Sequence, residues 1–124
     1  MNVYKQMWAA MVQAASIPDP ELPVLAKFAS GEALRKLRYS LVVDLQYGFV
    51  TRGPLRIAPQ STAVSPGEVQ VTDCLDDSQA LKYKSDGSLK DDIPGGRHQV
   101  EATVTRAGAD WKVSDLHVKE TGTC

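Results

Sequence analysis

The sequence predicts an α+β fold in which a helical first half is followed by an antiparallel β-sheet. Up to about residue 47 the apolar side chains recur at intervals of three and four, which is the period of an amphipathic helix. From Pro54 onward they alternate with polar residues, which is the period of a strand with one buried face. Because the helices precede the strands and do not alternate with them, we expect an antiparallel sheet.

The first helix is predicted over residues 2–16, where the apolar residues form one wide stripe. The stripe consists of Val3, Tyr4, Met7, Trp8, Met11, Ala14 and Ala15. Pro18 ends this helix, because proline disfavours the helical conformation at the residue before it. A short second helix is predicted over about 20–28, with Asp19 as its N-cap and Pro20 in its first position.

The third and longest helix is predicted from Glu32 to Gln46 or Tyr47, with Ser30 as its N-cap and Gly48 as its stop. One face of this helix carries leucines. They are Leu34, Leu37, Leu41 and Leu45. We expect the last three of them to pack on the inner face of the sheet, against Val100, Ala102 and Val104.

The strands follow, separated by turns rich in glycine and proline. Alternation predicts strands near residues 55–59, 69–74 and 80–84, and a polar loop from Ser85 to Gly96 comes next. The last two strands form a hairpin, with Val100, Ala102 and Val104 in the first and residues 111–118 in the second. These segments predict three helices packed on a curved antiparallel sheet of four to five strands, with the whole chain, 1–124, as one domain.

The two cysteines, Cys74 and Cys124, are candidates for one disulfide bond. A chain terminus normally frays and its thiol adds little to a core, so a final cysteine is best explained by a bond that holds the end. The bond would close a loop of 51 residues, Cys74 through Cys124, which the chain-entropy argument values at about 4 kcal/mol. The alternative is two unrelated thiols, one buried and one exposed. A bond would place the protein outside the reducing cytosol.

The charge and the hydropathy of the chain exclude some classes of partner. Fourteen Lys and Arg against fifteen Asp and Glu leave a net charge of −1, which lacks the basic footprint of a protein that binds nucleic acid. No apolar run approaches the roughly 18 residues that a membrane span requires, and the N-terminus lacks the apolar core of a signal peptide. We therefore expect an exported or cell-envelope protein whose signal or anchor belongs to a longer precursor, with Met1 added for expression.

The order of elements resembles a known superfamily. Three N-terminal helices, a break at Gly48 and a final hairpin containing Gly-x-x-Trp-Lys-Val, from Gly108 to Val113, resemble the nuclear transport factor 2-like, SnoaL-like or cystatin-like cone fold. The Asp73-Cys74-Leu75-Asp76 segment with a Gly122-Thr123-Cys124 end is similar to small exported proteins and lipoproteins of high-GC Gram-positive bacteria. Extended helical N-termini are also found in cone-fold assembly factors of type IV secretion. The resemblance implies a sheet rolled around a long helix, with a pocket open at one end.

Enzymes of this superfamily place an acid/base pair, usually Asp and His, inside the pocket. In this chain Asp115 and His117 alternate on one strand face with Trp111 and Val113, as a pocket wall would, but a solvated strand end gives the same pattern. Asp44 borders the leucine face and either points into the cone or pairs with a cation such as Arg38 or Arg56. The predicted pocket residues are Trp8, Asp44, Tyr47, Trp111, Asp115 and His117. His98 is interpreted as a structural histidine at a strand start.

Other chemistries are not indicated. The two histidines lie far apart and the two cysteines are expected to bond to each other, so no metal site is predicted. The chain has no Gly-x-Gly-x-x-Gly run, no Walker A run and no Gly-x-Ser-x-Gly elbow, and we expect no bound cofactor.

Two classes of function are consistent with these residues. The first is a noncatalytic exported domain that binds another envelope protein or a copy of itself, as in an assembly or secretion scaffold, because no clear acid/base pair is present. The second is a small-molecule site or a hydratase- or isomerase-like enzyme that uses the cone pocket. A cone plugged by Leu, Met and Trp side chains would favour the first class, and a deep pocket holding Asp and His within hydrogen-bond reach would favour the enzyme.

Overall fold

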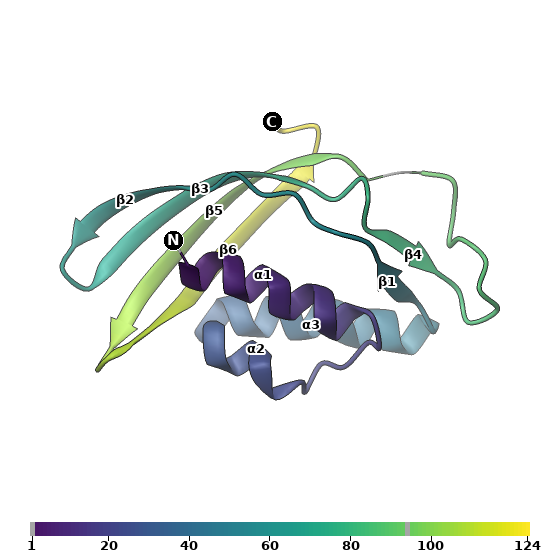
Figure 1. Cartoon of the computed structure of the whole chain (residues 1–124), viewed down its shortest axis with the longest axis horizontal. Coiled ribbons are helices and arrows are strands. Elements are labelled where there is room, and N and C mark those ends of the chain that lie inside the picture. Colours follow the sequence, from purple (N-terminus) through teal and green to yellow (C-terminus); the bar gives the residue numbers. More distant parts are fainter. Residues whose placement is uncertain (1, 94) are drawn as a thin grey trace.

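A computed structural model describes residues 2–93 and 95–124 and has the α+β architecture that the sequence predicts (Figure 1). The helices come first: α1 (Asn2–Ala15), α2 (Pro23–Phe28) and α3 (Gly31–Tyr47). The strands follow: β1 (Val50–Arg52), β2 (Gln60–Ser65), β3 (Glu68–Asp76), β4 (Leu81–Tyr83), β5 (Arg97–Ala107) and β6 (Asp110–Thr121).

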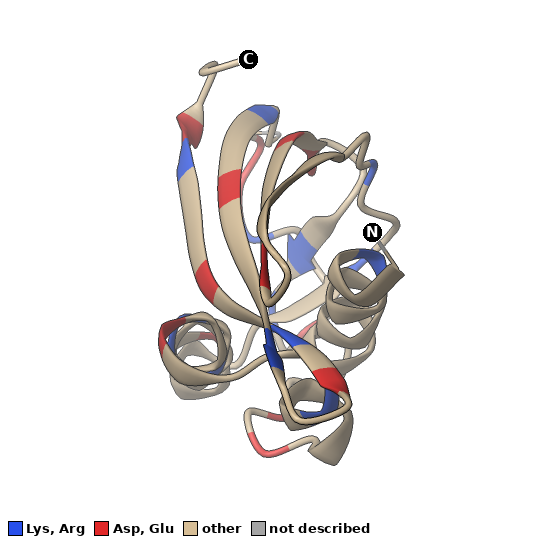
Figure 2. Cartoon of the chain, turned by 90° about the vertical axis from the view of Figure 1, so that its left-hand side faces the viewer, with Lys and Arg blue, Asp and Glu red and all other residues tan. Residues whose placement is uncertain are grey.

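The strands form two antiparallel sheets. The larger has four strands in the order β2-β3-β5-β6, and β1 pairs with β4 in a separate sheet of two strands. Figure 1 shows the large sheet curving over the three helices, which lie on its concave side. Seen from the side in Figure 2, acidic and basic residues of both signs are spread over sheet and helices.

The second helix begins later than predicted. Asp19 and Pro20 lie in a turn, in which the Asp19 side chain accepts a hydrogen bond from the Glu21 amide at 2.9 Å. Pro23, and not Pro20, takes the first position of α2. Both prolines satisfy the rule that favours proline at a helix start, so the rule alone could not choose between them.

The start and the end of α3 lie where the sequence placed them, but its N-cap works differently. Ser30 has an extended backbone and makes no side-chain capping hydrogen bond. Its backbone N–H donates instead to the Val113 carbonyl of β6 at 2.9 Å, so tertiary contact takes over the role of the cap. At the other end Gly48 adopts the left-handed conformation, φ 71°, and the Phe49 amide closes the helix onto the Asp44 carbonyl at 2.9 Å.

The segment near residues 55–59 is not a strand of the large sheet. Leu55 and Ile57 are half-buried against the core as predicted, but only Arg56 joins a ladder, exchanging two backbone hydrogen bonds with Asp76. Prolines at positions 54 and 59 lack the N–H that a longer ladder needs. The sheet instead gains β2, which is exposed on both faces and therefore has no alternating pattern for the sequence to reveal.

A β-bulge in β6 changes which of its side chains face the core. Thr103 pairs with Asp115 and Val104 pairs with Val113, so Ser114 is the extra residue. Beyond the bulge the buried residue is Leu116, and Asp115 turns away from the side of Val113. The predicted single face of Trp111, Val113, Asp115 and His117 is therefore wrong, because alternation continues only while the register is unbroken.

The core has two parts. In the first, the N-terminal half of α1 and the first half of α3 pack on the sheet; its largest members are Tyr4, Met7, Trp8, Leu37, Val71, Leu75, Val100, Val104, Val113 and Leu116. In the second, α1, α2 and α3 pack on one another through Ala10, Ala14, Ala15, Leu25 and Leu41.

The leucines of α3 diverge around the helix. Each residue turns the helix by about 100°, so a spacing of four advances the side chain by about 40°. Leu37 therefore faces the sheet, Leu41 faces the helical part of the core, and Leu45 is 55% exposed. The expectation that all three pack on the sheet was wrong for Leu41 and Leu45. Asp44, seven positions after Leu37, returns to the inner face and is buried.

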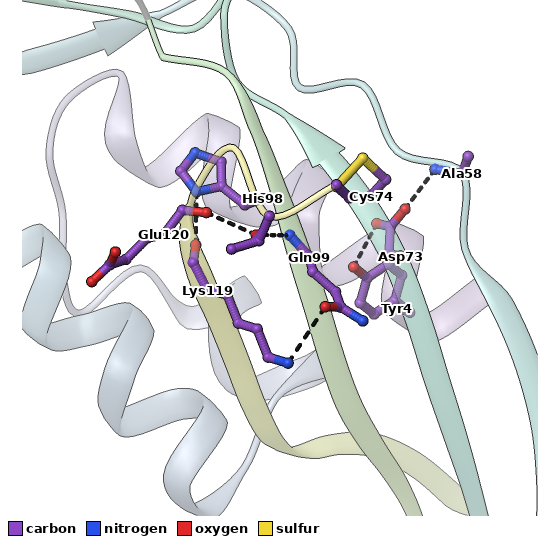
Figure 3. Close-up of a disulfide and its surroundings, with 10 residues drawn as sticks. Tyr4, Ala58, Asp73, Cys74, His98, Gln99, Lys119 and Glu120 are labelled. Atoms are coloured by element: carbon purple, nitrogen blue, oxygen red, sulfur yellow. Dashed lines mark hydrogen bonds between the residues drawn. A yellow bond between two sulfur atoms is a disulfide. The ribbon is translucent and has the colours of Figure 1, made fainter.

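The predicted disulfide is present. Cys74 and Cys124 are bonded, with their Cα atoms 5.9 Å apart (Figure 3). Cys74 lies on β3 and Cys124 follows β6, so the bond spans the intervening strand β5. The last residues are also held by the Gln99 amide, which donates to Thr123 Oγ1 at 2.8 Å, and by the Gly122 amide, which donates to the Arg97 carbonyl at 2.7 Å.

We predict that Cys124→Ser lowers the free energy of unfolding by up to about 4 kcal/mol, because the bond restricts the unfolded chain. The double variant Cys74→Ser/Cys124→Ser should lose no more than the single variant, since both remove one bond. Urea denaturation of the three proteins measures this. Two alkylatable thiols in protein made under oxidising conditions would contradict the bond itself.

Two leucines one turn apart provide a matched test of the core. Leu41→Ala should cost roughly 2–5 kcal/mol, because Leu41 is fully buried among three helices. Leu45→Ala should cost less than about 1 kcal/mol, because its side chain is largely solvated. Equal losses at the two positions, measured by urea denaturation, would mean that the buried face of α3 is assigned wrongly.

Candidate functional site

A buried polar contact holds α1 against the sheet. The Tyr4 hydroxyl donates to Asp73 Oδ2 at 2.6 Å, and the Ala58 amide donates to Asp73 Oδ1 at 2.7 Å (Figure 3). Burial raises the pKa of the Tyr4 hydroxyl, and the contact with Asp73 raises it further, so this hydroxyl remains a donor at neutral pH. Asp73 thereby joins α1, β3 and the segment between β1 and β2.

The two halves of α1 pack on different parts of the protein. Its first half packs on the sheet through residues such as Tyr4 and Met7, and its second half packs on α2 and α3 through Ala10 and Ala14. A cavity of about 840 Å³ lies between the second half of α1, α3 and the strands. This volume is within the range of sites that hold small molecules.

The wall of the cavity is mostly apolar. Apolar side chains come from α1, α3, the β1–β2 segment, strands β3 and β6 and the turn before β4, and they are Trp8, Met11, Val12, Ala15, Leu37, Leu55, Leu75, Ala80, Leu116 and Val118. Gly53 also lines the cavity, at a backbone φ of 115°, and a Cβ at this position would clash with the Gln79 carbonyl. Glycine is therefore required at this turn.

α3 contributes a polar row to the wall. Lys36, Ser40 and Asp44 are spaced by four residues, which places them one above another on one face of the helix, and all three line the cavity. The row runs from a cation, through a hydroxyl, to a carboxylate.

The carboxylate end of this row is a closed ion pair. Lys82 Nζ of β4 lies 2.8 and 2.7 Å from the two oxygens of Asp44 and 3.1 Å from Thr51 Oγ1 of β1. The Asp44 side chain is 6% exposed and that of Lys82 35%. All three protons of the ammonium group are engaged, so the pair is a fixed part of the wall.

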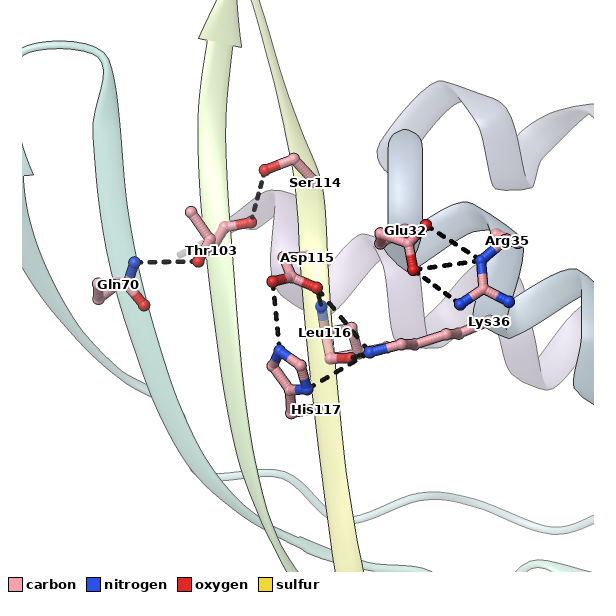
Figure 4. Close-up of polar contacts among 9 residues, drawn as sticks. All are labelled: Glu32, Arg35, Lys36, Gln70, Thr103, Ser114, Asp115, Leu116 and His117. Atoms are coloured by element: carbon pink, nitrogen blue, oxygen red, sulfur yellow. Dashed lines mark hydrogen bonds and ion pairs between the residues drawn. The ribbon is translucent and has the colours of Figure 1, made fainter.

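The other end of the row lies at the edge of β6. Lys36 Nζ donates to the Leu116 carbonyl at 2.7 Å and lies 3.4 Å from His117 Nδ1, while His117 Nε2 lies 3.2 Å from Asp115 Oδ2 (Figure 4). The His117 and Asp115 side chains are 58% and 43% exposed. Partial burial tends to raise the pKa of Asp115, but the Leu116 amide and His117 lower it on balance.

Three of the six predicted pocket residues line this cavity and three do not. Trp8, Asp44 and His117 contribute to its wall. Tyr47 is 70% exposed and stacks on Phe49, with ring centroids 5.7 Å apart. Trp111 packs on the edge of the core, with the Arg106 guanidinium over its ring.

Asp115 is not among the residues that line the cavity, although its side chain contacts His117, which does line it. Asp44 also differs in its partner: it pairs with Lys82, whereas Arg38 lies 4.0 Å from Glu21. His98 is held at both ring nitrogens, with Nδ1 2.8 Å from the Lys119 carbonyl and Nε2 3.1 Å from Asp77 Oδ2.

Sequence reasoning missed Lys36, Ser40, Thr51 and Lys82. The first two carry a usable signal, because polar residues at a spacing of four on an apolar helix face indicate a lined cavity or a buried contact. Thr51 and Lys82 lie in strands of three residues, which are too short to show a period.

Residues 2–93 and 95–124 show neither a cluster of metal ligands nor a helix that could span a membrane. No group of three or more His, Cys, Asp or Glu in this part of the chain is arranged to hold a metal ion. None of the helices described there is long and apolar enough to cross a membrane.

Comparison with known proteins shows the fold. No family model and no curated protein matches the chain. Among solved structures, it is similar to the intermembrane space region of the chloroplast protein ARC6, with a TM-score of 0.62 and 15% identity over 97% of this chain and 93% of that one. It is also similar to a putative scytalone dehydratase from Novosphingobium aromaticivorans, with a TM-score of 0.61 and 16% identity over 98% of this chain and 83% of that one.

A third similar structure is a protein of unknown function with a cystatin-like fold from Nostoc punctiforme, with a TM-score of 0.55 and 14% identity over 97% and 90% of the two chains. These likenesses support the nuclear transport factor 2-like, or cystatin-like, cone fold that the sequence resemblance implied. At such identities they concern the fold alone.

The Asp44–Lys82 pair can be tested by a double-mutant cycle. Lys82→Met should lower the free energy of unfolding by about 2 kcal/mol, because it leaves a buried carboxylate without its cation, although Lys82 itself is partly solvated. The double variant Asp44→Leu/Lys82→Met should recover most of this loss. The matched control is Lys119→Met, which breaks the exposed pair with Glu101 and should cost less than about 0.5 kcal/mol. Strictly additive losses at Asp44 and Lys82 in urea denaturation would refute the coupling.

Proposed function

We propose that this protein is a noncatalytic, extracytoplasmic binding domain that holds a small apolar molecule in its cone. The observation that carries the proposal is the cavity of about 840 Å³ with its mostly apolar wall. A domain that used its cone only as a scaffold for protein contacts would be stabilised by filling this space with its own side chains, because dense packing is the rule for protein interiors. An apolar molecule in the cavity would supply the missing contacts.

The charged groups support a noncatalytic role. A general acid or base needs a free nitrogen or oxygen facing the substrate. Asp44 has both oxygens on Lys82, and His117 has Asp115 at one ring nitrogen and Lys36 at the other. Two Asp–His contacts lie beside the cavity: Asp115–His117 at its solvated rim, and Asp77–His98, in which the Lys119 carbonyl and the Gly96 amide engage the other His98 nitrogen and the other Asp77 oxygen. The carboxylate of Asp44 has a lysine and not a histidine as its partner.

A hydratase- or isomerase-like activity is the second candidate, and the Asp115–His117 contact of 3.2 Å beside the cavity favours it. The fold is compatible with it, since one of the similar structures is a putative scytalone dehydratase. The two candidates differ in their need for His117, because an enzyme would require it for turnover and a binding domain would not.

An oxidising compartment follows from the disulfide bond in this proposal. Such bonds persist in secreted and envelope proteins and are rare in the cytosol. The likeness to an intermembrane space region is consistent with this placement. A protein partner or self-association would act in addition to the cavity and is not needed for ligand binding.

The test uses diphenylhexatriene, a hydrocarbon that fluoresces in apolar surroundings. We predict that the protein binds it at one site, with energy transfer from Trp8, which lines the cavity. Val12→Trp should weaken binding at least about tenfold, or about 1.4 kcal/mol, because the larger side chain fills the cavity. The adjacent Gln13→Trp places the same indole on the exposed side of α1 and should leave the affinity unchanged.

His117→Asn completes the experiment. A binding domain should keep its affinity for the probe within a factor of about two, as for other exposed positions. Equal loss of binding in Val12→Trp and Gln13→Trp, with both proteins folded by circular dichroism, would show that the probe does not bind in the cone. No binding of the probe by the unaltered protein would refute the proposed function.

A further inference from the structure

The charged residues of the cavity wall are balanced. Three lysines and three carboxylates line it: Lys36, Lys82, Lys119, Asp44, Asp77 and Glu101. Inside the wall, Lys82 and Asp44 are bonded to each other at 2.7 and 2.8 Å. Toward the end of β6, Lys119 Nζ lies 3.4 Å from Glu101 Oε1.

The remaining charged groups are also engaged within the protein. Asp77 accepts a hydrogen bond from the Gly96 amide at 2.8 Å and lies 3.1 Å from the His98 ring. Lys36 donates to the Leu116 carbonyl at 2.7 Å, and its Nζ lies 3.9 Å from Asp115 Oδ1. In the described part of the chain, every ammonium and carboxylate group of the wall therefore has an intramolecular partner.

This closed set of pairs disfavours a charged ligand. A carboxylate or an ammonium group that left water for the apolar wall would lose its hydration and would find its natural counter-charges already bonded. To gain a partner it would have to open a pair such as Asp44–Lys82, and that would leave one buried charge alone. An uncharged molecule meets neither cost.

Two side chains of the wall, Trp8 and Ser40, carry a polar atom without a hydrogen-bond partner in the described part of the chain; Trp8 Nε1 is buried, whereas the Ser40 hydroxyl is open. Ser40 is exposed to the cavity midway along the α3 row, and its hydroxyl has no hydrogen-bond partner among residues 2–93 and 95–124. It lies one turn from Lys36 on one side and one turn from Asp44 on the other. Both of these side chains already form hydrogen bonds within the protein. A hydroxyl can donate and accept, so it suits an alcohol or a carbonyl group on the ligand.

We infer that the natural ligand is an uncharged, mainly apolar molecule with a hydroxyl or carbonyl group that bonds to Ser40. The inference rests on the proposed function, because it names the ligand class of the same cavity. The closed ion pairs select against charge, the apolar wall binds the hydrocarbon part, and Ser40 orients the polar group.

Three ligands of equal chain length test the selection against charge. 1-Dodecanol, dodecanoate and dodecylammonium, each below its micellar concentration at pH 7, compete with bound diphenylhexatriene. We expect dodecanol to displace the probe at a concentration at least about tenfold lower than either ion requires, because only the ions carry an uncompensated charge into the wall. Displacement by dodecanoate or dodecylammonium as effective as that by dodecanol would overturn the inference and leave the proposed function intact.

Ser40→Ala tests the orienting contact. It should weaken dodecanol about fivefold, as expected for one neutral hydrogen bond, and should leave the affinity for the hydrocarbon probe unchanged. Ser61→Ala, on exposed strand β2, is the matched control and should change neither affinity. Unchanged binding of dodecanol by Ser40→Ala would overturn the assignment of the polar group. Failure of diphenylhexatriene and of all three ligands to bind would overturn the proposed function and this inference together.

Discussion

The hydrogen bond from Tyr4 to Asp73 is the contact on which the arrangement of helix and sheet depends. It fixes the first turns of α1 on β3, inside the core, at a distance of 2.6 Å. From this fixed point α1 leaves the sheet and continues against α2 and α3, through small side chains such as Ala10 and Ala14. The space left between the diverging helix and the sheet is the cavity. A helix that stayed on the sheet along its whole length would leave no such space.

The sheet that receives this contact is itself held on both of its faces at the same place. Asp73 and Cys74 are neighbours on β3, so their side chains point to opposite faces. Asp73 binds α1 and the Ala58 amide on the concave side, and Cys74 bonds to the chain terminus on the other (Figure 3). The edge at β6 is covered by the Ser30 amide and by Lys36, which donate hydrogen bonds to the carbonyls of Val113 and Leu116. The helices are therefore joined to the sheet at an edge as well as through the core.

The same contacts give the charged residues of the wall their structural partners. Lys36 serves the edge of β6, Lys82 neutralises a carboxylate that α3 has carried inside, and His98 and Asp77 tie the start of β5 to the turn after β3. In the function that we propose, these partners keep the charged groups from taking part in chemistry, and the apolar side chains that dominate the wall bind the ligand. A cavity of this kind is suited to binding an uncharged molecule without changing it, and the disulfide is consistent with that role in an oxidising compartment.

The sequence by itself determined that three helices precede an antiparallel sheet, the end of α3 at Gly48, the hairpin of the last two strands and the pairing of the two cysteines. These follow from local periodicity, from the conformations that glycine and proline allow, and from the absence of any other thiol. Three of the six predicted pocket residues, Trp8, Asp44 and His117, do line the cavity, and each is a polar or aromatic group next to an apolar face.

Only the tertiary structure decided the rest. The bulge at Ser114 lies next to the hydrogen bond between Ser30 and Val113 and reverses the faces of Asp115 and Leu116, which no alternation in β6 could reveal. The pairing of Asp44 with Lys82 joins residues 38 positions apart on a helix and a strand of three residues. Local patterns record which way a side chain faces within its own element, whereas a cavity and its closed ion pairs depend on how separate elements are placed against one another.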